Sequence, residues 1–346
     1  MSDDILFERR GGLGLVTLNR PKALNAITLA MVRALAGQLD AWAMDDRIKA
    51  VMIQGAGGKA FAAGGDIQRL YDAMSDPADD YPVPFFAEEY ALNRKIKHFP
   101  KPYVALYNGI VMGGGVGVSV HGSHRIATDA TMFAMPETGI GFFPDVGGAY
   151  FLPRLKHGLG AYMALTGGRL DGGDCVAEGL ADAYLPIAKT DTLITALAAT
   201  DDVAAAIASV AEPAPDGGLA AARSAIAGCF DQSCIGDILE ALRRDGTDWA
   251  AKQTTAIAAK SPLSLAITWE QLQQGAGLEF DACLVLEYRM ALACCSSGEF
   301  REGVRALIVD KDNTPKWRYA NVADVPTADI AAHFAAPATG DLAFND

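Results

Sequence analysis

Residues 101–148 read KPYVALYNGIVMGGGVGVSVHGSHRIATDATMFAMPETGIGFFPDVGG, and the rest of the chain can be interpreted around them. The apolar run at 103–107 predicts a buried strand. It leads into three glycines at 113–115, and the small residues from about 116 predict a helix. A glycine turn that opens a helix presents free backbone N–H groups. A ligand atom can approach these groups closely because no Cβ intervenes.

Two carboxylates follow this turn in the same stretch. A second strand is expected at 125–128, after which Glu137 follows Pro136 and Asp145 follows Pro144. An anion-binding turn with two carboxylates in apolar surroundings is typical of sites for acyl transfer or enolate chemistry. On local grounds, Glu137 could equally be a helix cap or a surface charge.

The glycine turn has other interpretations. It could be only a tight turn or a close helix–sheet contact. The glycines do not fit G-x-G-x-x-G and no Gly-Lys-Ser/Thr follows, so the dinucleotide and P-loop motifs are excluded. Residues 102–123 lack Asp, Glu, Lys and Arg and are numerous enough to cross a membrane. Their many glycines favour a buried strand, turn and helix instead.

Composition limits the class of protein. The 346 residues are 51% hydrophobic and 21% charged, as in ordinary globular chains with one large or two modest domains. A net charge of −13 without a basic run argues against nucleic acid as a partner. The six cysteines lack Cys-x-x-Cys spacing and are expected to be reduced thiols. The start, MSDDILFERR, lacks signal-peptide features, so a cytoplasmic protein is expected.

Further elements can be predicted along the chain. Strands are expected at 13–18, 50–54 and 183–185, and Thr28 is a candidate N-cap for an amphipathic helix. The order of strand, glycine turn and helix occurs a second time at Ala63-Gly64-Gly65, where a helix opens at Asp66.

These patterns predict an α/β region at 1–210 and a helical C-terminal region at 211–346. Pro, Gly and Asp cluster at 211–218, which indicates a linker. Between 280 and 293 apolar residues recur at helical spacing, as expected for a core helix. The strands alone do not distinguish this arrangement from an ordinary doubly wound sheet.

Two short strings resemble the oxyanion-loop signatures of the crotonase (enoyl-CoA hydratase/isomerase) superfamily: KAFAAGGD at 59–66 and MGGG at 112–115. Longer strings resemble the 3-hydroxyisobutyryl-CoA hydrolases of that superfamily, among them FAMPETGIGFFPDVGGAYFLPRL at 133–155 and EGVRALIVDKD at 302–312. The resemblance covers roughly residues 5–335. It implies a crotonase-like spiral of repeated ββα units with a helical C-terminal region.

The resemblance also implies a set of site residues. The backbone N–H groups of Ala63 and Gly114 would form an oxyanion hole, and Glu137 and Asp145 would be catalytic. The expected substrate contacts are Glu89, Gly114, Glu137 and Asp145. Judged alone, Glu89 would be a solvated helix charge, and only the resemblance makes it a substrate contact.

This chain departs from the hydratases of the superfamily. They place a catalytic glutamate where this chain has Gly117, and commonly a glycine where it has Asp145. The departure argues for a different reaction on the same CoA platform, and the resemblance implies that this reaction is the hydrolysis of 3-hydroxyisobutyryl-CoA in valine breakdown. Glu137 could be a general base on water or a nucleophile. Asp145 could orient the water, protonate the departing thiolate or hold the substrate hydroxyl.

The expected protein is therefore an acyl-CoA thioesterase. Two alternatives stay open: another crotonase-type reaction, such as enoyl-CoA hydration or isomerisation, and a noncatalytic acyl-CoA-binding relative. No cofactor is expected beyond the CoA of the substrate, and no metal, because no ligand cluster is evident. The expected partner is a small acyl-CoA and not nucleic acid or a membrane; a homo-oligomer is compatible with the sequence.

Overall fold

The computed structural model describes residues 3–76 and 78–344. The chain divides into two compact units. The first comprises 1–65, 91–133 and 169–220, and the second comprises 66–90, 134–168 and 221–346. This differs from the expected division at 210, because two segments of the predicted α/β region belong to the same unit as the C-terminal helices.

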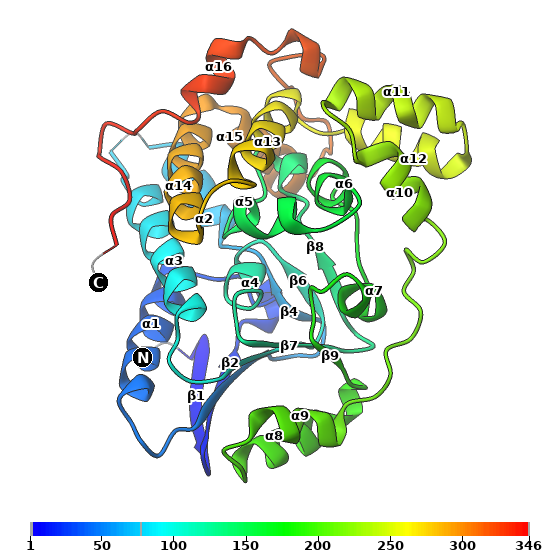
Figure 1. Ribbon diagram of the computed structural model, residues 1–346. Helices are drawn as coiled ribbons and strands as arrows, with labels where there is room; N and C mark the ends of the chain where they lie inside the picture. The colour runs from blue at the N-terminus through cyan, green and yellow to red at the C-terminus, as the bar shows by residue number, and fades with distance from the viewer. Residues whose placement is uncertain (1–2, 77, 345–346) are drawn as a thin grey trace. The chain divides into compact units, whose positions relative to one another are not determined.

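The first unit contains a six-stranded sheet, seen in Figure 1. β1 and β2 are antiparallel, and every other neighbouring pair in this sheet is parallel. The strand order is β1 (Ile5–Arg10), β2 (Leu13–Leu18), β3 (Ala50–Gly55), β5 (Tyr103–Tyr107), β7 (His124–Ala127) and β9 (Ala183–Tyr184). The strand predictions at 13–18, 50–54, 103–107, 125–128 and 183–185 are thus confirmed to within a residue or two.

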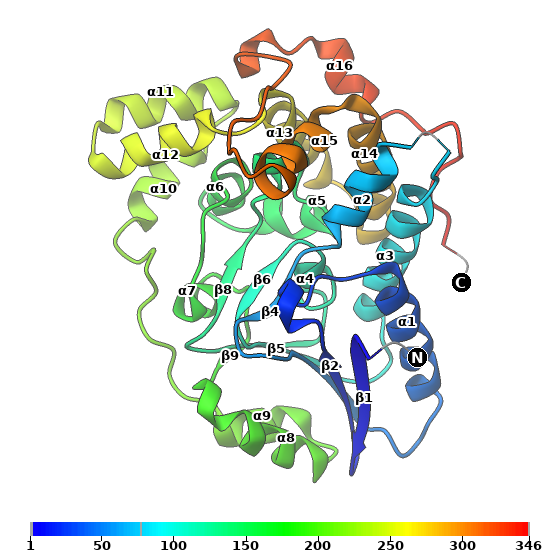
Figure 2. The ribbon, with the colours of Figure 1, turned by 180° about the vertical axis from the view of Figure 1, so that it is seen from behind.

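Helices cover this sheet because its strands β2, β3 and β5 are apolar on both faces. α8 (Thr190–Ala198) and α9 (Val203–Val210) lie side by side in Figures 1 and 2 and bury their apolar side chains against one face. α1 (Leu29–Ala43) begins at the predicted cap, where the Thr28 hydroxyl accepts the N–H of Met31. A Cβ on Gly14 would lie only 2.8 Å from the ring of Trp42 in α1. Position 14 therefore requires glycine.

A second sheet holds the glycine turns. Its order is β4 (Ala60–Ala63), β6 (Ile110–Met112) and β8 (Met132–Ala134). β4 and β6 are parallel and Ala63 pairs with Met112. The buried Asn108 side chain binds both backbone groups of Gly55, at 3.0 and 2.7 Å, and so ties the ends of β3 and β5 together. α4 (Gly114–Gly117) follows β6, and α7 (Gly172–Ala177) completes the unit.

The second unit is helical. α3 runs from Pro82 to Lys97, and its residues up to Tyr90 belong to this unit. The Tyr162 ring of α6 contacts Phe230 and Trp249, with centroids 5.3 and 6.3 Å apart. The other helices are α2 (Ile67–Met74), α5 (Gly148–Phe151), α6 (Leu159–Thr166), α10 (Arg223–Phe230), α11 (Ile235–Asp245), α12 (Asp248–Ala258), α13 (Pro262–Gly275), α14 (Phe280–Ser297), α15 (Glu299–Val304) and α16 (Thr327–Ala332).

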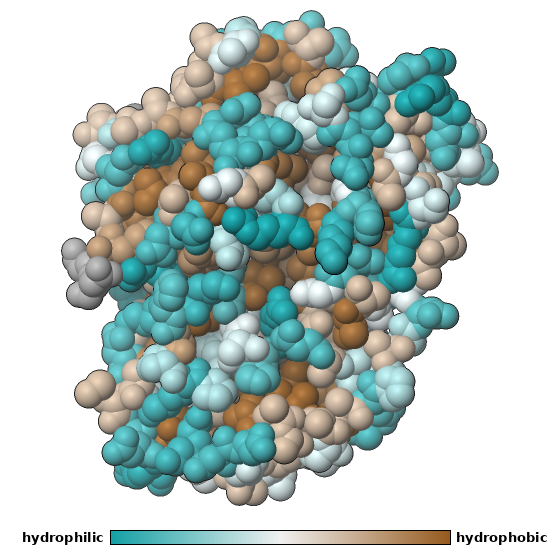
Figure 3. All heavy atoms as spheres, in the orientation of Figure 1, coloured by the Kyte–Doolittle hydropathy of each residue, from teal (hydrophilic) through white to brown (hydrophobic). Residues whose placement is uncertain are grey.

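Amphipathic patterning explains the outer helices of this unit. α11 buries Ile235, Ile238 and Leu242 and exposes Arg243 and Arg244. In Figure 3, hydrophilic atoms accordingly cover the outer surface of α11 and α12. Because α11 is polar on one side only, its position follows from burial of the apolar stripe.

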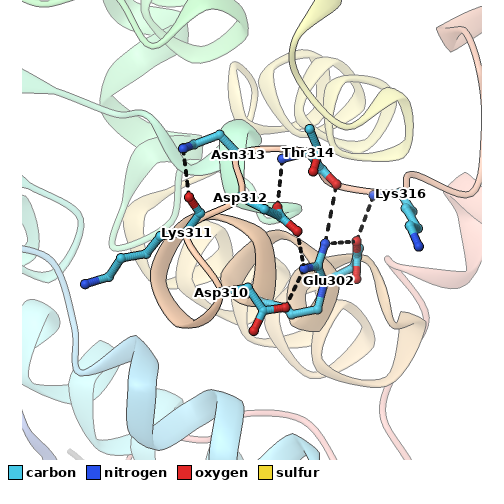
Figure 4. A network of polar contacts seen from close by, with 8 residues as sticks. Glu302, Asp310, Lys311, Asp312, Asn313, Thr314 and Lys316 are labelled. Atoms are coloured by element: carbon cyan, nitrogen blue, oxygen red, sulfur yellow. Dashed lines mark hydrogen bonds and ion pairs between the residues drawn. The ribbon is translucent and has the colours of Figure 1, made fainter.

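Arg305 binds several acidic residues in and after α15, and Figure 4 labels three of these partners, Glu302, Asp310 and Asp312. The guanidinium binds Glu302 through two bonds of 2.9 and 2.8 Å. It also binds Asp310 at 2.6 Å and Asp312 at 2.7 Å. Glu302 in turn accepts the N–H of Lys316 at 2.8 Å. Three carboxylates on one cation therefore hold residues 302–312, which include a short π-helix at Arg305–Val309.

None of the helices in the described ranges is long and apolar enough to cross a membrane. The uncharged run at 102–123 contains β5, β6 and α4 instead; this confirms the predicted strand and turn, whereas the helix expected from about 116 is the single turn Gly114–Gly117.

Candidate active site

The two glycine turns of the first unit leave neighbouring strands. Because Ala63 of β4 pairs with Met112 of β6, the residues two positions further along are Gly65 and Gly114. Parallel strands end at the same edge of a sheet, so these two turns lie at one edge. Gly114 is the first residue of α4, where a backbone N–H has no intrahelical partner.

The expected role of Ala63 is wrong. Its N–H donates to the carbonyl oxygen of Leu24 at 3.0 Å and is therefore already used by the fold. Within the described part of the chain, neither the Gly65 nor the Gly114 N–H donates a hydrogen bond. Gly65 is therefore the better counterpart of Gly114. The strand and glycine turn expected at 59–66 are present, but the backbone N–H that the fold leaves unused lies two residues beyond Ala63.

Glycine is needed in these turns for two reasons. Gly64 and Gly113 have φ values of +113° and +47°, a region that side chains disfavour. A Cβ on Gly115 would lie 2.2 Å from the carbonyl oxygen of Ala62, so the two turns could not approach each other with a larger residue.

Glu137 lies in the second unit, at the start of a short 3-10 helix, η2 (Glu137–Ile140), and is 7% exposed. The next residue anchors η2, since Thr138 accepts the N–H of Ser261 at 3.2 Å. Lys260 lies against η2. If Gly139 carried a Cβ, that atom would lie 3.3 Å from the Lys260 ammonium. Burial lowers the pKa of Lys260, and the charge of Glu137 acts in the opposite direction. Glu137 is thus a buried group and not the surface charge considered above.

Asp145 lies in the turn before α5 and is 6% exposed. The hydroxyl of Tyr90 donates to its Oδ2 at 3.0 Å. Burial raises the pKa of Asp145 to about 7, although the Tyr90 hydrogen bond acts to lower it. At neutral pH this carboxyl can therefore both hold and release a proton, which general acid–base catalysis requires.

Glu89, the residue before Tyr90 on α3, is 2% exposed, so it is not a solvated helix charge. Burial and the charge of Asp145 raise the pKa of Glu89 well above its ordinary value. Its Oε1 has no hydrogen-bond partner among the described residues. A buried oxygen without a partner is costly and marks a place where a ligand group can bind.

Two buried residues beside Asp145, namely Tyr90 and Glu287, were not predicted from the sequence. Glu287 occupies a position of the apolar stripe of α14 and is fully buried. A glutamate at a stripe position was the signal that could have identified it, because a buried charge needs partners. No group of three or more metal-ligating side chains is present in residues 3–76 and 78–344.

Comparisons with known proteins match nearly the whole chain. The model of the enoyl-CoA hydratase/isomerase family matches residues 13–334. The Mus musculus protein named 3-hydroxyisobutyryl-CoA hydrolase, mitochondrial, is 45% identical over 99% of this chain and 91% of its own length. The Homo sapiens protein of that name is 42% identical over the same shares. Both names specify mitochondria, so the expectation of a cytoplasmic protein is wrong.

Solved structures share the fold. A carnitinyl-CoA dehydratase from Mycobacterium thermoresistibile has a TM-score of 0.94 and 43% identity, with 99% of both chains covered. An enoyl-CoA hydratase from Rhodobacter sphaeroides has a TM-score of 0.92 and 36% identity, covering 99% of this chain and 100% of its own. These similarities confirm the predicted crotonase-like fold.

Proposed function

Because this chain belongs to the enoyl-CoA hydratase/isomerase family, we propose that it hydrolyses 3-hydroxyisobutyryl-CoA to 3-hydroxyisobutyrate and CoA, a step of valine breakdown. One observation carries the proposal: Asp145 is a buried, hydrogen-bonded carboxyl, whereas Gly117 replaces a carboxylate that the resembling hydratases use. The near full-length similarity to relatives named for this hydrolysis supports it.

In the first unit, the N–H groups of Gly65 and Gly114 are the proposed donors to the thioester oxygen. Attack on the carbonyl carbon moves negative charge onto that oxygen, and two preorganised donors stabilise it. The loss of one such donor typically costs roughly 100- to 1,000-fold in rate.

In the second unit, Glu137 is the proposed base or nucleophile. As a base it would take a proton from water as the water attacks the carbonyl carbon; as a nucleophile it would form a mixed anhydride that water then cleaves. In both versions the carbon–sulfur bond breaks and CoA leaves as a thiolate. Asp145, with a pKa of about 7, would donate a proton to that thiolate.

Glu89 is the proposed contact for the 3-hydroxyl of the substrate. Its unpartnered Oε1 is buried, and a hydroxyl can supply the missing hydrogen bond. A substrate without the hydroxyl would leave the oxygen unpaired, and sites that bind a polar group in this way reject deoxy analogues strongly.

Glu89→Ala should therefore lower kcat/KM for 3-hydroxyisobutyryl-CoA more than for isobutyryl-CoA. The difference in transition-state free energy between the two substrates should decrease by about 1–3 kcal/mol, which is the cost of leaving a buried polar group unsatisfied. The measurement is kcat/KM for both thioesters, with Glu88→Ala on the same helix as the matched control. An unchanged ratio of the two substrates in Glu89→Ala would remove Glu89 from substrate recognition.

The proposed activity can be tested by following thiol release from a panel of small acyl-CoA esters. We expect CoA release from 3-hydroxyisobutyryl-CoA, negligible hydration of crotonyl-CoA, and rates that a chelator leaves unchanged, since the proposed chemistry uses neither metal nor cofactor. Binding of these esters without turnover would instead favour a noncatalytic acyl-CoA-binding protein.

A second candidate is a hydratase or dehydratase reaction. The observation in its favour is that the two solved structures with TM-scores above 0.9 carry such names. Efficient hydration of crotonyl-CoA with little thiol release would support this reaction and contradict the hydrolase proposal.

A further inference from the structure

Glu287 holds the backbone on the C-terminal side of Asp145. Its Oε2 accepts the N–H of Gly147 and its Oε1 accepts the N–H of Ala149, each at 2.7 Å. The Nε2 of Gln271 lies 3.5 Å from the same Oε1. These partners are all donors, and such an arrangement suits an ionised carboxylate. Burial raises the pKa of Glu287 to about 8 and the charge of Asp145 also raises it, whereas the two backbone N–H groups and Gln271 act to lower it.

Gln271 holds the backbone on the other side of Asp145. Its side-chain amide donates to the carbonyl oxygen of Pro144 at 2.7 Å. Gln271 belongs to α13 and Glu287 to α14, so two core helices bind residues 144, 147 and 149. The segment 144–149, which we call the Asp145 turn, is therefore fixed on both sides of the carboxyl it carries.

The Asp145 turn has a backbone that must be held in place. Val146 has a φ of +51° and Gly147 a φ of +90°. A β-branched residue in the left-handed region is strained and persists only where surrounding contacts impose that conformation. Two short bonds to a buried carboxylate supply such contacts. Without them, the turn could relax and carry the Asp145 side chain away from Tyr90.

We propose that Glu287 is a positioning residue, which keeps the carboxyl of Asp145 at the hydroxyl of Tyr90 by fixing the Asp145 turn. The proposal rests on the proposed function, in which Asp145 takes part in the chemistry. It goes beyond that function by assigning a role to a residue 142 positions further along the chain. Glu287 binds the backbone of Gly147 and Ala149, and this backbone in turn positions Asp145 for its hydrogen bond with Tyr90.

The titration of Asp145 tests this proposal without substrate. The Tyr90 hydrogen bond lowers the pKa of Asp145, so a loss of that bond should raise it. Glu287→Gln places an amide donor against a backbone N–H and should therefore raise the Asp145 pKa, as Tyr90→Phe should. The Asp145 pKa in the double variant should be little higher than in either single variant, because both substitutions act through the Asp145–Tyr90 hydrogen bond. Carboxyl ¹³C NMR over pH 5–9 measures all three.

Activity gives a second measurement. Glu287→Gln should lower kcat about 10-fold or more with KM nearly unchanged, as expected when an interaction is lost in the transition state only. The matched control is Asp174→Asn, since Asp174 is also a buried carboxylate that accepts a backbone N–H, from Leu219 at 3.0 Å. The control should lose thermal stability without a change in kcat or in the Asp145 titration.

Two outcomes would overturn the proposal. An unchanged Asp145 titration in Glu287→Gln would make Glu287 a purely structural residue, and a lowered pKa would mean that it acts through its charge. If Glu287→Gln does not fold, Gln271→Met, which removes the bond to Pro144, should raise the same pKa. A wild-type protein that does not cleave 3-hydroxyisobutyryl-CoA would contradict the proposed function but leave this titration test intact.

Discussion

Glu137→Gln is expected to reduce kcat at least about 100-fold while binding of the CoA ester stays nearly unchanged. An amide is neither a base nor a nucleophile, and loss of general base catalysis alone typically costs about 100- to 10,000-fold. The substitution conserves the size of a side chain that is only 7% exposed, so the packing of η2 should survive. Steady-state kinetics gives kcat, and calorimetric titration with a nonhydrolysable ester gives the binding constant.

The same variant separates chemistry from folding when it is compared with Glu88→Gln, which should keep wild-type kcat. A near-normal kcat in Glu137→Gln would remove Glu137 from the mechanism. The two versions of the mechanism differ in where water oxygen goes. Single-turnover hydrolysis in ¹⁸O-water should label the Glu137 side chain if it is the nucleophile, and only the product acid if it is the base.

Most of the large sheet could be predicted from the sequence because β2, β3 and β5 are continuous apolar runs, but β1 was not predicted because its residues are mostly exposed. The small sheet could not, since β4, β6 and β8 have only three or four residues each and adjoin glycines. Such short segments carry no periodic signal and form because neighbouring strands pair with them. The error at Ala63 has the same origin. The pairing of Ala63 with Met112 shows which residues leave the sheet together, and the sequence string does not contain that register.

The carboxylates were predicted through family resemblance, but their surroundings were not. The sequence showed Glu89 and Asp145 as isolated acids 56 residues apart. In the second unit, burial raises the pKa values of both carboxyls, and the charge of Asp145 raises that of Glu89 further. Glu287 was overlooked because the helical spacing of its apolar neighbours was taken as evidence for core packing alone. A buried polar network depends on tertiary contacts, and these are not encoded in local sequence.

Asp145→Asn is expected to slow hydrolysis of 3-hydroxyisobutyryl-CoA and isobutyryl-CoA by similar factors of about 100-fold, because both reactions need a proton for the departing thiolate. The limb of the kcat–pH profile that reflects a pKa of about 7 should disappear with the carboxyl. The measurement is kcat for both thioesters between pH 5 and 9, with the exposed Asp72→Asn as the control that keeps the wild-type profile. A selective loss of the hydroxylated substrate would instead assign the hydroxyl contact to Asp145.

The same substitution should stabilise the protein at high pH. An aspartate has a pKa of about 3.9 in an unfolded chain, so the folded protein, with a pKa of about 7, binds the extra proton between these values. A raised folded-state pKa means that the free energy of unfolding falls as pH rises through this window, and the loss is complete near pH 8. Asn cannot ionise, so the free energy of unfolding of Asp145→Asn should exceed that of the wild type by about 1–4 kcal/mol at pH 8. The two free energies should be equal near pH 4.

Urea unfolding at pH 5, 6.5 and 8 measures this difference, and Asp72→Asn should follow the wild-type curve at each pH. Equal pH dependence in Asp145→Asn and the wild type would contradict the raised pKa. A gain in stability together with a loss of turnover would mean that the buried carboxyl is retained for its chemistry at a cost to the fold, as expected for a catalytic group. A loss of both would instead make Asp145 part of the framework that holds the site, with Tyr90 as its structural partner.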